Sequence, residues 1–238
     1  MSRVVILYGP PGSGKGTQAE LLSRKYDFIH FDSGRYIEAL VHSEAAKKDP
    51  ILMREKKNFD TGILCTPEWV LKVTRNEAIR VAKSGFNLVF SGAPRTLFEA
   101  FGDDDCIVQD PAKGGRKTKG LIESLEKAFG RENISVILFT VGDNISIFRN
   151  SNRKVCSVCG LPLLESAKTK HCGLCGGAMR TRTLDKVEII KDRLVQYKTR
   201  TFPIIKELKK RGYAVKTIKA EKLPFEIFKS VERALKLR

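Results

Sequence analysis

The chain has 238 residues, 42% of them apolar, so it is not disordered as a whole and is long enough for one large domain or a core with smaller inserts. No apolar run is long enough to cross a bilayer, and the first residues lack a signal-peptide pattern. We therefore expect a soluble, cytoplasmic protein with no membrane partner. The formal net charge of +17 favours polyanions such as nucleotides, RNA or DNA, although solvated helix faces such as Lys206–Arg211 explain many lysines without any ligand.

Apolar segments typical of buried strands alternate with segments of helical periodicity along the chain. The expected strands are Val4–Tyr8, Asn87–Phe90, Ile134–Phe139 and Tyr213–Ile218. The expected helices include Gly16–Lys25, Pro67–Lys83 and Leu121–Phe129. This alternation predicts an α/β fold in which helices cover a parallel sheet.

Two segments interrupt this alternation. Ser33–Gly62 is expected to form short helices with a charged middle and no strand, which predicts a small helical insert. Arg153–Arg182 contains cysteines and several glycines but little helical periodicity, which predicts a second insert. A third stretch, Gly102–Gly120, has no clear periodicity and is expected to be a mobile loop.

Gly9, Gly14 and Lys15 form the pattern G-x-x-x-x-G-K between the first expected strand and the first expected helix. Glycines at these positions let backbone N–H groups turn inward and cradle phosphate oxygens, aided by the positive end of the helix. The sequence therefore predicts a phosphate-binding loop in which Lys15 neutralises the β and γ phosphates, the alternative being an ordinary Gly-rich turn. The side-chain hydroxyl comes not directly after Lys15 but one residue later, at Thr17.

Four of the six cysteines form two C-x-x-C-G pairs separated by twelve residues: Cys156, Cys159, Cys172 and Cys175. This spacing favours a structural Zn²⁺ site with four thiolate ligands, in which the following glycines let backbone N–H groups point at the sulfurs. Two disulfides, an iron–sulfur cluster, or His171 as a competing ligand are the alternatives. Cys65 and Cys106 lie apart from this group and are expected to be buried or incidental.

Further landmarks follow in the order found in the adenylate kinase family of nucleoside monophosphate kinases, which the chain resembles over nearly its whole length. They are the runs Gly14–Gln18, Phe31–Gly34, Asp60–Leu64, Phe90–Thr96, Asp143–Arg153 and Arg182–Lys186, the last followed by Lys191–Leu194. A lid with four cysteines also occurs in some adenylate kinases. The resemblance implies reversible transfer of a phosphoryl group from ATP to AMP, giving two ADP, by a monomer that uses Mg²⁺ bound to ATP near Thr17 and Zn²⁺ in the lid.

The resemblance also implies a P-loop NTPase three-layer fold with a parallel sheet of about five strands. The core would comprise residues 1–31, 64–152 and 184–238, the helical monophosphate-binding insert residues 32–63, and the zinc-ribbon-like lid residues 153–183. The implied ATP site consists of Gly12, Ser13, Gly14, Lys15, Gly16, Thr17, Arg149, Arg153 and Lys222. The implied AMP site consists of Ser33, Gly34, Leu64, Gly92, Arg95 and Glu99. The implied catalytic residues are Lys15, Arg95, Arg153, Arg182, Asp185 and Arg193.

Many arginines suit this chemistry, because phosphoryl transfer needs alignment and charge stabilisation more than covalent work, and planar guanidinium groups match phosphate oxygens.

The chain departs from the family pattern at four positions. Glu38 stands where a second arginine for the AMP phosphate is usual, with Arg35 one turn earlier, and Leu184 replaces one of two aspartates at the end of the lid. Ser91 stands where an aspartate orders water around Mg²⁺.

The fourth departure, Glu99, stands where a glutamine reads adenine and leaves open another acceptor such as GMP, because a carboxylate suits a base that offers N–H donors. A second class of function is an ATPase that reads RNA or DNA through its zinc knuckles. Against that alternative, the lid has no interleaved aromatic residues for stacking on bases. We therefore expect no nucleic-acid partner.

Overall fold

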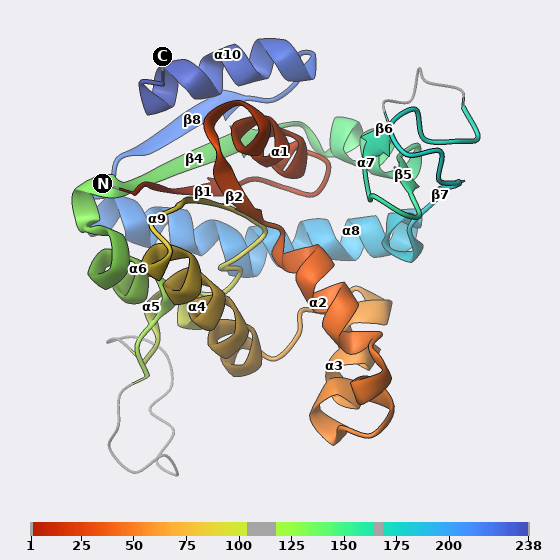
Figure 1. The fold of residues 1–238 in the computed structure, drawn as a ribbon, viewed down its shortest axis with the longest axis horizontal. Coiled ribbons are helices and arrows are strands. Elements are labelled where there is room, and N and C mark those ends of the chain that lie inside the picture. Colours follow the sequence, from red (N-terminus) through yellow and green to blue (C-terminus); the bar gives the residue numbers. More distant parts are fainter. Residues whose placement is uncertain (1, 104–117, 164–168, 238) are drawn as a thin grey trace.

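The computed structural model describes residues 2–103, 118–163 and 169–237, and a five-stranded parallel sheet lies at its centre (Figure 1). The strand order is β2–β3–β1–β4–β8. The bounds are β1 Val4–Tyr8, β2 Phe28–Phe31, β3 Asn87–Ser91, β4 Ile134–Thr140 and β8 Val215–Lys219. The predicted α/β architecture is confirmed, and β2 is the strand that the pattern of apolar segments did not predict.

Strand β1 is the middle strand of the sheet, and all five of its residues are buried. This position suits its sequence, because all five residues are apolar or aromatic. Successive side chains point to opposite faces of a strand, so β1 contributes to two cores. Ile6 packs into the core on one face, with Phe90 and Leu138. Leu7 packs into the core on the other face, with Val89 and Phe139. The sheet is therefore the middle of three layers.

Helices cover both faces of this sheet (Figure 1). Side chains of α1 (Lys15–Tyr26) and α10 (Pro224–Leu235) fill the core on one face. Side chains of α4 (Pro67–Lys83), α5 (Leu97–Phe101), α6 (Leu121–Phe129) and α9 (Phe202–Lys210) fill the core on the other. Helices α7 (Asp143–Ser151) and α8 (Val187–Gln196) pack on each other, and α8 runs through a π-helical turn, Tyr197–Thr201, into α9.

The segment between β2 and α4 consists of helices, as its composition predicts. It forms α2 (Ser33–Val41), a 3₁₀ turn (Glu44–Lys47) and α3 (Pro50–Thr61). An aspartate caps each helix: Asp32 accepts the N–H groups of Gly34 and Arg35, and Asp49 caps α3 in the same way. A small apolar cluster that includes Ile37, Val41 and Val70 joins this segment to α4.

The cysteine-bearing segment forms a separate antiparallel sheet beyond α7, of order β6–β5–β7. Its strands are β5 Lys154–Cys156, β6 Pro162–Leu163 and β7 Met179–Arg180, followed by a 3₁₀ turn at Thr183–Asp185. The middle of the loop expected to be mobile, including Cys106, lies outside the described residues. Within the described parts of the chain, no helix is both long enough and apolar enough to span a membrane.

A buried carboxylate joins α3 to the start of α4. Glu55 is fully buried and accepts hydrogen bonds from the backbone N–H of Thr66 (2.7 Å) and its hydroxyl (2.5 Å), and it pairs with Arg54 (2.8 Å). Burial raises the pKa of Glu55, but the hydrogen bonds from Thr66 and Arg54 outweigh it and leave the pKa below its usual value. Its stabilising effect is therefore present above the unfolded-state pKa and is lost as pH falls through the folded-state pKa.

We expect Glu55→Ala to lower the free energy of unfolding by about 2 kcal/mol at pH 7, because the Thr66 N–H loses its partner. Urea denaturation of both proteins would measure the difference, which should shrink below about pH 4 as Glu55 becomes protonated in the wild type. An equal difference at pH 7 and pH 3.5 would contradict the role given to the ionised carboxylate.

Candidate nucleotide site and four-cysteine cluster

The loop between β1 and α1 has the backbone of a phosphate cradle. Gly12 adopts φ +73°, and a Cβ at this position would lie 2.5 Å from the Asn150 side chain, so only glycine fits. The Lys15 ammonium donates to the carbonyl oxygens of Gly9 (2.7 Å) and Pro10 (2.8 Å), which holds it against the loop. The loop N–H groups and the start of α1 thus face the same space as Lys15.

That space is a cavity of about 1080 Å³ bounded by the loop, α2, the segment after β3, the small sheet and α8. Most of the predicted site residues line it: Gly12, Gly14, Lys15, Gly16, Thr17, Gly34, Leu64, Gly92, Arg95, Arg149, Arg153, Arg182, Arg193 and Lys222. The others are buried behind the lining: Ser13, Ser33, Glu99 and Asp185. Segments far apart in the sequence therefore meet at one site.

Cationic side chains outnumber carboxylates along the lining of this cavity. Burial and the neighbouring guanidinium groups of Arg193, Arg95 and Arg153 lower the pKa of Lys15 to about 7. Burial and the same kind of repulsion lower the pKa of Arg193 to about 9. Cationic groups that repel one another in a cavity form a site for a polyanion.

Two carboxylates hold individual arginines in place. Asp185 accepts two hydrogen bonds from Arg153, at 2.6 Å and 3.0 Å, in the forked geometry that suits a guanidinium. Glu38 on α2 pairs with Arg182 (3.2 Å) and more weakly with Arg180 (3.6 Å). The residue at the position of the expected arginine thus binds an arginine of the lid.

Helix α2 also contacts the first cysteine pair. Arg35 donates to the carbonyl oxygen of Cys159 (3.3 Å). A Cβ added at Gly160 would lie only 2.7 Å from the Arg35 guanidinium, so glycine leaves room for it. Together with the Glu38–Arg182 pair, this contact places the small sheet against the helical insert. Residues of both segments, among them Arg35 and Cys159, therefore line the cavity.

Arg149 and Lys222 line the same cavity from the side of α7 and α10. Arg149 donates to the carbonyl oxygens of Ala220 (2.6 Å) and Glu221 (3.1 Å). A residue without a sequence signal, Gln196 on α8, binds the N–H of Leu64 (3.1 Å) and the carbonyl oxygen of Gly62 (3.1 Å). Gln196 therefore fixes the end of the helical insert against α8.

Glu99 is one of the predicted residues that do not line the cavity. Its carboxylate accepts the backbone N–H of Arg95 (2.7 Å) and lies 3.2 Å from the Thr96 hydroxyl, and it does not line the cavity. Burial raises its pKa to about 7, against the lowering effect of the Arg95 N–H. In this structure Glu99 supports the Arg95 loop and does not face the cavity.

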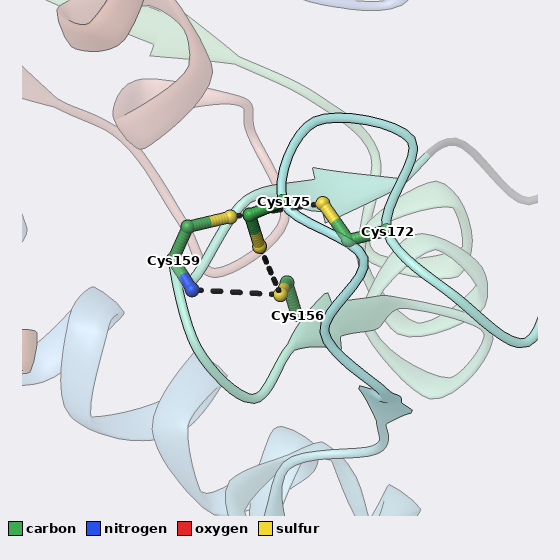
Figure 2. A group of neighbouring side chains, drawn as sticks. All are labelled: Cys156, Cys159, Cys172 and Cys175. Carbon is green, nitrogen blue, oxygen red and sulfur yellow. Dashed lines mark hydrogen bonds between the residues drawn. The ribbon is translucent and has the colours of Figure 1, made fainter.

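The four cysteines converge on one point, as Figure 2 shows. Sγ of Cys156 lies 3.5 Å from that of Cys175, and Sγ of Cys159 lies 3.7 Å from that of Cys172. Four thiolates bound to zinc at about 2.3 Å in a tetrahedron would lie about 3.8 Å apart, so the cluster fits the ion. The separations are too long for disulfides, and His171 is not in the cluster.

Backbone N–H groups point at two of the sulfurs. Val158 and Cys159 donate to Cys156 Sγ, and Leu174 donates to Cys172 Sγ, all at 3.4 Å. Burial raises the pKa of Cys156, but these N–H bonds outweigh it and lower the pKa to about 6. Cys156 therefore offers a thiolate near neutral pH, as a metal ligand requires. The Leu161 N–H lowers the pKa of Cys159, but burial and the neighbouring sulfurs outweigh it and raise the pKa to about 12. Cys65 is buried outside it, as expected.

We expect the purified protein to carry about one metal ion per chain and Cys172→Ser to lose it, because three thiolates leave a structural tetrahedron incomplete. Elemental analysis after gel filtration would measure the metal. Cys65→Ala is the matched control, since Cys65 is outside the cluster, and it should retain the metal. Equal metal content in both variants would argue against the four-cysteine site.

We also expect a nucleoside triphosphate to bind with uptake of about one proton per chain at pH 8, because its phosphates restore the pKa of Lys15 from about 7 towards its usual value. Calorimetry in buffers of different ionisation enthalpy would measure the uptake, which should fall towards zero at pH 6. Lys15→Met should abolish it. Binding heats that do not depend on the buffer at pH 8 would contradict this assignment.

Comparison with known proteins agrees with this geometry. A sequence profile of the adenylate kinase family matches residues 7–213. A protein named adenylate kinase from Caldicellulosiruptor saccharolyticus is 30% identical, with 97% of this chain and 98% of that protein covered. Adenylate kinases from Clostridium tetani and a Hydrogenobaculum species are 27% and 29% identical, with at least 96% of each chain covered. Because the profile matches most of the chain, this protein belongs to the adenylate kinase family.

Proposed function

We propose that this chain catalyses reversible, Mg²⁺-dependent transfer of a phosphoryl group from ATP to AMP, giving two ADP. The main support is a group of cationic side chains, Lys15, Arg95 and Arg193, that face one cavity and form no ion pair with a carboxylate in the described parts of the chain. A cavity of about 1080 Å³ is at the upper limit of volumes usual for a single ligand, as suits a site for two nucleotides.

In this proposal the donor and acceptor bind in the two halves of the cavity. Residues Gly12–Thr17 hold the phosphates of ATP through backbone N–H groups and Lys15. Arg149 and Lys222 flank its base and ribose, while Arg95, behind Gly92, binds the phosphate of AMP. Ser33, Gly34 and Leu64 bound the acceptor half. The ends of both nucleotides then meet among the arginines.

The arginines carry the chemistry, because phosphoryl transfer spreads negative charge over the equatorial oxygens. Arg153, Arg182 and Arg193 donate to those oxygens, and Asp185 fixes the Arg153 guanidinium before the nucleotides arrive. Bound Mg²⁺ would neutralise charge on the β and γ phosphates, and the oxygen-bearing side chains of Thr17, Asp32 and Ser91 in the cavity lining suit it. The lid excludes water, so the phosphoryl group passes to the acceptor and not to a water molecule.

We propose Zn²⁺ as the ion of the four-cysteine cluster, with a structural role. No residue of the small sheet belongs to a hydrophobic core cluster among the described residues, so a metal would supply the cross-link that apolar packing does not. The lid, residues 153–183, then moves as one unit against residues 32–63, and residues 1–31, 64–152 and 184–238 form the core. We further propose that the protein acts as a monomer.

Two alternatives have less support. A carboxylate at Glu99 would favour guanine, but here it bonds to the N–H of Arg95 and lies beside the Thr96 hydroxyl, so no observation favours GMP over AMP. A nucleic-acid reader would need its knuckles free, whereas Cys159, Gly160 and Leu174 line the nucleotide cavity. AMP is therefore the proposed acceptor.

We expect ATP-dependent ADP formation with AMP in a coupled assay that also offers GMP, CMP and UMP in turn. Arg95→Ala should lower kcat/KM for AMP by roughly 100-fold or more, because one preorganised donor to phosphate is lost, while the Kd for ATP stays within about threefold. Arg80→Ala, which removes an exposed arginine on α4, is the matched control and should not change either constant. No ADP with any acceptor would overturn the proposal.

A further inference from the structure

Three polar side chains from different elements form a hydrogen-bonded chain at the carboxyl edge of the sheet. His30, on β2, lies between them. Its Nε2 is 2.6 Å from Oγ of Ser91, the last residue of β3, and its Nδ1 is 3.4 Å from Oε2 of Glu20 on α1. Of the three, only Ser91 belongs to a sequence motif, so local patterns did not predict its contact with His30 and Glu20.

The chain ends next to the phosphate loop. Ser91 pairs in register with Leu7 of β1, two residues before Gly9, and Ser91, His30 and Glu20 all line the nucleotide cavity together with Thr17. P-loop proteins generally hold the cation of the nucleotide with a hydroxyl from the loop and a carboxylate from a nearby strand. Here the end of the neighbouring strand β3 offers a hydroxyl.

The hydrogen-bond pattern changes what that hydroxyl can do. A serine hydroxyl has one proton to donate and two lone pairs to accept with. The Glu20 carboxylate favours the histidine tautomer with its proton on Nδ1, which leaves Nε2 as an acceptor. The Ser91 proton then points to Nε2, so the oxygen offers only its lone pairs to the cavity.

We propose that Glu20 and His30 are positioning residues that make Ser91 Oγ a dedicated acceptor for the water shell of the nucleotide's Mg²⁺. This proposal rests on the proposed function only in that the bound nucleotide carries a divalent cation. A histidine that merely completed the fold would need no particular direction of the serine proton. Here both ring nitrogens have polar partners, Glu20 at Nδ1 and Ser91 at Nε2.

The experiment compares ATP binding with Mg²⁺ and with EDTA by calorimetry, with no acceptor nucleotide present. The ratio of the two dissociation constants measures the contribution of the cation. We expect His30→Leu to reduce this ratio roughly tenfold, as for loss of one hydrogen bond to a charged group, while the Kd in EDTA changes less than about twofold. His42→Leu, at an exposed histidine directly after α2, is the matched control and should not change the ratio.

Coupling between the residues provides a second readout. Ser91→Ala should reduce the ratio as much as His30→Leu, and the double variant no further, because both remove the same acceptor. Ser91→Asp should restore the ratio in the His30→Leu background, since it supplies a carboxylate directly. If His30→Leu does not fold, Glu20→Gln, at a side chain that is 40% exposed, should still reduce the ratio about threefold.

An unchanged ratio in His30→Leu, or in Glu20→Gln where that variant replaces it, would overturn the inference, as would equal loss of affinity with Mg²⁺ and with EDTA. The outcome is separable from that of the proposed function. Normal transfer to AMP with an unchanged ratio would reject only the role of His30. A reduced ratio in a protein that transfers to no acceptor would reject only the proposed reaction.

Discussion

Repulsion among the cations around the phosphate loop is the constraint on which the rest of the structure depends. Lys15 and Arg193 lie in one cavity with other arginines, and their mutual repulsion and burial lower both pKa values. Such a group destabilises the empty protein, so rigid elements must hold it. The sheet does this, because β1 and β3 end side by side and place the loop opposite Arg95.

Carboxylates behind the cavity determine which cations remain free for a ligand. Asp185 accepts hydrogen bonds from two nitrogens of Arg153, and Glu38 pairs with one nitrogen of Arg182. These arginines are therefore oriented before a nucleotide binds. The Glu38 pair also links α2 to the lid. Glu38, a departure from the family pattern, therefore joins two elements that bound the cavity. The same contact neutralises part of the charge of Arg182 and holds the lid against α2.

The lid is ordered without a hydrophobic core of its own. Its short strands bury few apolar side chains, so its order depends on four sulfurs that lie within 4.8 Å of one another and on N–H groups that favour the thiolate form. The lid contacts the helical insert through Arg35 as well as Glu38. A segment without a core can thus still bound the nucleotide cavity.

Local patterns determined much of this protein: the phosphate loop between a strand and a helix, the four long apolar strands, and the two cysteine pairs were all readable because each depends on residues close in sequence. The edge strand β2 was not readable, because it is short and half of its side chains are not buried. The tertiary structure alone decided that Glu38 meets Arg182, that Glu99 turns away from the cavity, and that His30 lies between Ser91 and Glu20. These contacts follow from how helices and strands pack on the sheet, and a side chain's nearest polar partner across that packing has no signature in local sequence.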